Sequence, residues 1–121
     1  MNSTNGTRRG SILAAADLRE EQVTVPEWGN VTLLARGFTG RQRSEFAGKH
    51  QPGQPTDFGK ALTDILIAGL FDPETREPVF TDADRDALLA KSGDILDRLS
   101  KVILKLSGLS DDAVGVAQKN F

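Results

Sequence analysis

The segment from Phe80 to Gly108 constrains the fold of this chain most strongly, because helix starts, apolar periodicity and helix stops agree along its length. Thr81 can cap a first helix by accepting from free N–H groups of the first turn, and Ser92 can cap a second. Gly108 suits the left-handed residue that ends a helix. The second helix has one continuous apolar face, formed by Ile95, Leu96, Leu99, Val102, Ile103 and Leu106.

The opposite side of this second helix is charged. Asp94–Arg98 and Asp97–Lys101 are i,i+4 pairs in the favourable order, each contributing about 0.3 kcal/mol. A helix with one apolar side and one charged side must pack its apolar side on another part of the chain. The sequence therefore predicts a helical core around residues 81–108.

Residues 21–37 change to the alternating period of a β-strand. Val23 and Val25 alternate with polar residues, and the same pattern resumes after a turn at Trp28–Gly29–Asn30, which predicts a β-hairpin. Pro26 has no N–H to donate, so its strand should be an edge strand or the pairing should break there. An edge strand is also a place where a partner's strand can add, and it would permit weak self-association.

The remaining segments predict shorter helices and a loop. Residues 11–18 favour a short helix that must dock on the body, because so short a helix is unstable alone. Residues 39–49 favour a polar helix anchored by Phe46, and residues 57–71 an apolar helix. Residues 50–56 contain two prolines and a glycine, so we expect a loop in which His50, the only histidine, is solvated.

Together these segments predict an α+β protein, in which an N-terminal β-hairpin packs on a small bundle of about four helices and the polar ends are disordered. We expect a disordered arm over residues 1–11, a single α+β domain over residues 12–110, and a fraying C-terminal helix or tail over residues 111–121. The chain of 121 residues is long enough for one domain with a real core.

Composition excludes several kinds of function. The chain has no cysteine, which rules out disulfides, thiolate zinc sites and cysteine nucleophiles, and its net charge of −2 offers no attraction to nucleic acid or an anionic membrane. The series Asp82, Asp84, Asp86 begins like an EF-hand loop, but Ala87 and Gly93 stand where the required glycine and glutamate belong. We therefore predict no catalytic residue, no cofactor and no metal site, and hence no enzyme.

The work that remains for such a domain is protein binding. Aromatic residues dominate binding hot spots, so the hairpin and its exit are the expected partner surface, with Trp28, Leu34, Phe38 and Phe46 as anchors. The alternative is a groove lined by Leu62, Leu66, Leu99 and Ile103, which would have to open because those residues otherwise form the core.

Several motifs occur in an order that resembles the tail assembly chaperones of long-tailed bacteriophages, from about Ile12 to Asn120. The opening ILAAADL is followed by VPEWGN at residues 25–30 and by GFTGRQRSEF at residues 37–46. The more specific part is ILIAGLFDPETREPVFTDADRDALLAKSGD, which leads through the helix to LSGLS at residues 106–110.

The resemblance implies a protein of the host bacterial cytoplasm that is not part of the mature virion. It also implies the partners: the tape measure protein, which it would bind and keep soluble; the tail tube protein, which it would help to recruit; and a longer, frameshifted form of itself. The ending Gln118–Lys119–Asn120 is compatible with a slippery codon series. The alternative function is a structural tail completion or connector subunit of the virion.

Overall fold

The hairpin that the alternating residues predict is present in the computed structural model, which describes residues 4–51, 53 and 57–109. Strand β1 (Glu20–Val25) pairs antiparallel with β2 (Val31–Arg36), and a single 3-10 turn, η1 (Pro26–Trp28), joins them. Gly29 and Asn30 complete the connection with positive φ angles of 78° and 60°. Both residue types tolerate this left-handed conformation, which is why the turn forms here.

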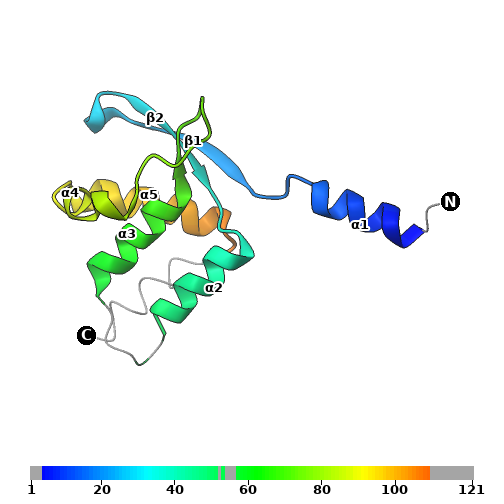
Figure 1. Ribbon diagram of the computed structural model, residues 1–121. Helices are drawn as coiled ribbons and strands as arrows, with labels where there is room; N and C mark the ends of the chain where they lie inside the picture. The colour runs from blue at the N-terminus through cyan, green and yellow to red at the C-terminus, as the bar shows by residue number, and fades with distance from the viewer. Residues whose placement is uncertain (1–3, 52, 54–56, 110–121) are drawn as a thin grey trace.

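A third strand, β3 (Leu70–Phe71), pairs antiparallel with β2 through Leu34 and Phe71. The sequence predicts helix as far as Phe71, but helix α3 ends at Gly69 and the chain becomes extended at Leu70. The strand order β1-β2-β3 leaves β1 at the edge of the sheet, as predicted from Pro26. The structure is therefore α+β, with a small antiparallel sheet beside the helices (Figure 1).

In the described part of the chain, four helices follow the hairpin, and local side chains cap the starts of two of them and of the 3-10 turn that leads into a third. Helix α2 (Gly40–Lys49) begins with a capping box between Thr39 and Gln42, and the side chain of Asp57 caps α3 (Phe58–Gly69). Thr81 forms the predicted cap, as a capping box with Asp84. It starts η2 (Asp82–Asp84), which continues into the short α4 (Arg85–Leu89).

Helix α5 (Gly93–Leu106) carries the predicted apolar face into the core. Ser92 occupies its N-cap position but makes no side-chain hydrogen bond there, and Gly108 ends it with the expected positive φ of 76°. Ile65 and Leu66 of α3 and Leu99 and Ile103 of α5 are among the most deeply buried side chains. Leu104 is buried as well, so the buried side of α5 is wider than predicted, because α5 contacts both α3 and β2.

The N-terminal helix departs from the prediction. Helix α1 spans Thr4–Ala14, so it covers most of the segment expected to be a disordered arm, and it starts well before Ser11. The sequence also predicts that the helix over residues 11–18 docks on the body. That prediction is wrong: α1 projects away from the sheet and the other helices (Figure 1), and Ile12 and Leu13 remain 65% and 68% exposed.

The predicted C-terminal helix or tail, residues 111–121, lies outside the described residues. Within the part of the chain that is described, none of the helices combines the length and the apolar content needed to cross a bilayer.

Candidate partner-binding surfaces

The four predicted anchors do not form one exposed surface. Trp28 on η1 and Phe46 on α2 are half-buried, with part of each ring accessible, whereas Leu34 and Phe38 are buried. Adjacent residues of a strand point to opposite faces of the sheet, yet Leu34 and its neighbours on β2 are all buried. The middle of β2 is therefore covered on both faces, which alternation in the sequence could not reveal. The partner-binding role of the four residues stays a prediction, and only Trp28 and Phe46 offer exposed area for it.

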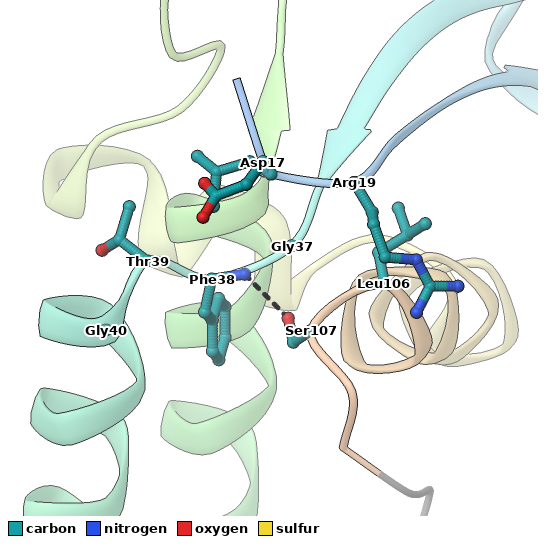
Figure 2. Close-up of a pocket in the computed structure, with 9 residues that line it drawn as sticks. Asp17, Arg19, Gly37, Phe38, Thr39, Gly40, Leu106 and Ser107 are labelled. Atoms are coloured by element: carbon teal, nitrogen blue, oxygen red, sulfur yellow. Dashed lines mark hydrogen bonds between the residues drawn. The ribbon is translucent and has the colours of Figure 1, made fainter. Parts of the chain in front are cut away.

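Phe38 lies where the hairpin leaves the sheet, below a pocket of about 410 Å³ (Figure 2). Its ring is directed between α2 and α3, and its centroid is 5.8 Å from that of Phe46. Its backbone N–H donates to Ser107 Oγ at 2.8 Å. In this arrangement Phe38 packs α2 onto the core, and its predicted role as a partner anchor stays a prediction.

The walls of this pocket come from three separate segments of the chain. Residues 17–19 precede β1, residues 37–40 lead into α2, and Leu106 and Ser107 end α5. Gly37 N–H donates to Arg19 O at 2.9 Å, and a Cβ built on Gly37 would lie 2.5 Å from Leu106 O. The absence of a side chain at Gly37 thus lets the hairpin exit pass close against the backbone at the end of α5.

Trp28 lines a second pocket, of about 140 Å³, at the opposite end of the hairpin. We call it the Trp28 pocket; its lining residues are Trp28, Phe80, Asp84, Ala87, Leu88 and Lys91. The aromatic and aliphatic side chains give it an apolar interior, while Asp84 and Lys91 supply one charge of each sign. Of the exposed large apolar residues, Leu89 directly follows Leu88 and Val79 directly precedes Phe80.

Three contacts hold the walls of the Trp28 pocket in place. Arg98 of α5 donates to Glu27 Oε2 at 2.7 Å and so ties η1 to α5. Val79 N–H donates to Leu70 O at 3.2 Å, which brings Phe80 back along β3. The Thr81 capping box then fixes Asp84 at the start of α4. The sequence pointed to Trp28 but not to Phe80 or Leu88 as residues of this pocket. These two residues reach Trp28 only because the chain returns along β3, and the sequence alone does not show that return.

His50 is predicted to be solvated in its loop, and this is wrong. Its side chain is only 5% exposed, its Nε2 lies 2.9 Å from Asp64 Oδ2, and its ring lies tilted by 50° against the ring of Phe46, with the centroids 4.7 Å apart. Asp64 also accepts from Arg85 at 2.8 Å, and Arg85 in turn pairs with Asp82 at 3.0 Å. The network joins the end of α2, the middle of α3 and the start of α4.

The pKa of Asp64 reflects this network. Burial on its own would raise it, but hydrogen bonds from His50 and Arg85, and the positive charges of Arg85 and Lys60, together lower the pKa below the ordinary value of 3.8. Asp64 therefore stays ionised and fixes the side chains around it.

The acidic series at the start of α4 is used for structure. Asp84 accepts from Thr81 N–H and Asp82 pairs with Arg85, so both carboxylates have partners within the chain. Among the described residues there is no group of three or more His, Cys, Asp or Glu side chains that could hold a metal ion. The alternative groove lies inside the core: Leu62, Leu66, Leu99 and Ile103 are all buried where α3 packs on α5.

Comparisons with known proteins identify a family and a similar fold. The model of a family described as "Phage tail assembly chaperone" matches residues 7–119. A solved structure described as "Structure of bacteriophage HK97 tail assembly chaperone" is 23% identical in sequence, with a TM-score of 0.58 over 86% of this chain and 95% of that one. That likeness supports the same fold. A comparison with curated protein sequences gives no match. Because the family match extends over nearly all of the sequence, this chain belongs to the phage tail assembly chaperone family.

Proposed function

We propose that this chain binds the tape measure protein of a long-tailed phage, keeps it soluble, and helps to recruit tail tube subunits while the tube polymerises. The observation that carries the proposal is the family match over residues 7–119. The chain would act in the host cytoplasm during assembly and would leave before the virion is complete. A longer frameshifted form would share the domain described above.

The surfaces of the molecule support such a role. A tape measure protein offers long amphipathic helices that aggregate when they are left bare, and a partner for them needs apolar surface rather than catalytic groups. The Trp28 pocket supplies an apolar interior, and within the described residues β1 lies at the edge of the sheet. Trp28 can thus still serve as a partner anchor, as predicted from its place at the hairpin turn.

The test is co-expression with the tape measure protein of the same phage. We expect the tape measure protein to be soluble when this chain is present and to precipitate when it is absent. Trp28→Ala should reduce the soluble fraction, while Val31→Ala, a control change at an exposed apolar residue of the hairpin, should not. A tape measure protein that stays insoluble with the unaltered chain would contradict the proposal.

Recruitment of the tail tube is tested separately by adding purified tube subunits to the soluble complex. We expect tubes to polymerise faster on the complex than in tube protein alone. Equal polymerisation rates would contradict the proposed recruitment of tube subunits but not the proposed solubilisation of the tape measure protein.

A further inference from the structure

Strand β1 pairs with β2 on one side, and on its other side no strand pairs with it among the described residues. Gly37 N–H donates to Arg19 O, so these two residues form a hydrogen-bonded pair at the end of the hairpin. Such pairs alternate with pairs whose N–H and C=O groups point away from the neighbouring strand. Glu20, Gln22 and Thr24 fall at these alternate positions. Their backbone donors and acceptors therefore point outward along the edge of the sheet.

A pocket of about 170 Å³ lies along this edge, and we call it the edge pocket. Its lining residues are Val23, Thr24, Val25, Ile95, Arg98, Leu99 and Val102. They come from β1 and α5, and none comes from β2, so the pocket lies on the side of β1 that faces away from β2. Five of the seven are aliphatic, which suits the pocket to an aliphatic side chain.

The outward backbone groups decide what kind of chain can bind here. A helix uses its own N–H and C=O groups internally, so only an extended segment can pair with those of β1. In such a segment, the residue opposite Val23 would belong to a closely spaced pair and would point to the same face of the sheet. Val23 and Val25 line the edge pocket from that face. The side chain opposite Val23 would thus enter the edge pocket and contact Val102.

Charge adds a second requirement for the bound segment. Glu21 lies two residues before Val23, on the same face of β1, and it is exposed. It makes no ion pair within the described part of the chain, whereas Glu20 pairs with Arg36 and Arg76. A basic residue of the added strand, two positions from the one in the edge pocket, would therefore face an acidic group that is available for pairing.

We propose that β1 binds the tape measure protein by strand addition, through an extended segment with an aliphatic residue in the edge pocket and a basic residue beside Glu21. The inference rests on the proposed function and specifies which kind of segment is bound. Exposed segments with alternating apolar residues aggregate by pairing with one another as strands. A chaperone that pairs with such a segment covers both its backbone groups and its apolar side chain, and so contributes directly to solubility.

The first experiment measures the binding of overlapping synthetic peptides that cover the tape measure sequence of the same phage, by fluorescence anisotropy. We expect the peptides that bind to share alternating apolar residues, with a basic residue two positions from one of them. Binding only by peptides with the i,i+3,i+4 apolar spacing of a helix would overturn strand addition. So would a lack of binding by every peptide when the whole tape measure protein is kept soluble.

Two variants test the two parts of the contact. Gln22→Pro removes an outward N–H that the hairpin does not use, and an edge strand tolerates proline at such a position. It should weaken peptide binding by about tenfold or more, since it removes a hydrogen bond and blocks close approach of the added strand. The matched control, Gln22→Thr, keeps the N–H and should bind like the unaltered chain.

Val102→Lys places a charged side chain in the edge pocket and should weaken binding by a similar factor. Val31→Lys is its matched control, because Val31 is an exposed valine that does not line the edge pocket. Thermal unfolding checks that all four variants are folded. Equal binding by each variant and its control would overturn the proposal.

Hydrogen exchange locates the contact residue by residue. In the free chain, the amides of Gln22 and Thr24 should exchange faster than those of Val23 and Val25, which pair with β2. A bound peptide should slow exchange at Gln22 and Thr24. Unchanged exchange at both amides in the complex would refute strand addition.

Co-expression separates this inference from the proposed function. A tape measure protein that stays insoluble with the unaltered chain would contradict the proposed function itself. A tape measure protein that is equally soluble with Gln22→Pro and with Gln22→Thr would contradict strand addition alone. If Gln22→Pro changed only the sedimentation of the chain by itself, the edge would belong to a second copy, and the proposal would be wrong.

Discussion

Replacing Asp64 with asparagine tests the buried network that joins α2, α3 and α4. The change keeps the shape of the side chain but removes the charge that holds His50 Nε2 at 2.9 Å and Arg85 at 2.8 Å. The carboxylate is only 11% exposed, so solvent screens these contacts little. Lys60, at 3.9 Å and nearly half exposed, adds little to them.

The expected loss of stability follows from the two hydrogen bonds that Asp64 accepts, from His50 and from Arg85. A hydrogen bond to a charged group contributes about 1.5–3 kcal/mol, and an asparagine can keep one partner on its oxygen while its amide group faces the other. Arg85 would retain its contact with Asp82. We therefore expect Asp64→Asn to lower the free energy of unfolding at neutral pH by about 2–3 kcal/mol, measured by urea denaturation.

The effect should depend on pH in one direction. The folded-state pKa of Asp64 lies below its unfolded value, so the folded protein gains stability from the ionised carboxylate above about pH 4 and loses it as the pH falls further. The difference between the unaltered chain and Asp64→Asn should shrink as the pH falls below that value.

The control is Asp94→Asn, which removes a carboxylate that is 84% exposed and 3.9 Å from Arg98. It should change stability by less than about 0.5 kcal/mol. The reasoning would be refuted if Asp64→Asn were as mild as this control, or if its effect were the same at low and neutral pH.

Two further pairs of substitutions test the packing around the hairpin exit and the turn. Gly37→Ala should lower the free energy of unfolding by about 2 kcal/mol or more, because its Cβ would lie 2.5 Å from Leu106 O. Gly48→Ala, in an open helical position, should instead raise the free energy of unfolding by about 0.5–1 kcal/mol. Thermal unfolding of the two variants measures both changes. Phe38→Ala should cost about 3 kcal/mol because the ring is buried, and the half-buried Trp28→Ala should cost less; equal costs in urea denaturation would show that Trp28 is core.

Local patterns predicted the main elements of this fold. Alternating Val23 and Val25 beside a glycine-containing turn indicated the hairpin, and the single apolar face of residues 95–106 indicated α5. These signals are reliable because each repeats several times within one element. Strand β3 has only Leu70 and Phe71, too short for any alternation, so nothing distinguished it from the end of the helix before it.

Features that depend on distant partners were harder to predict. The burial of His50 requires Asp64, which lies on a different helix, and sequence spacing gives no sign of their contact. The exposure of α1 was missed for a related reason. A short helix is expected to dock because it is unstable alone, but the sequence does not show whether the body offers a surface within reach of α1.

The most direct test of the proposed chaperone function is a pull-down of the tagged chain from cells that produce the phage tail proteins, with mass spectrometry of the bound proteins and of purified virions. The proposed function predicts a very long, helix-rich tape measure protein among the bound proteins, and no trace of this chain in the virions. Recovery of this chain as a stoichiometric component of the virion, without bound tape measure protein, would contradict it and would identify a structural tail subunit instead.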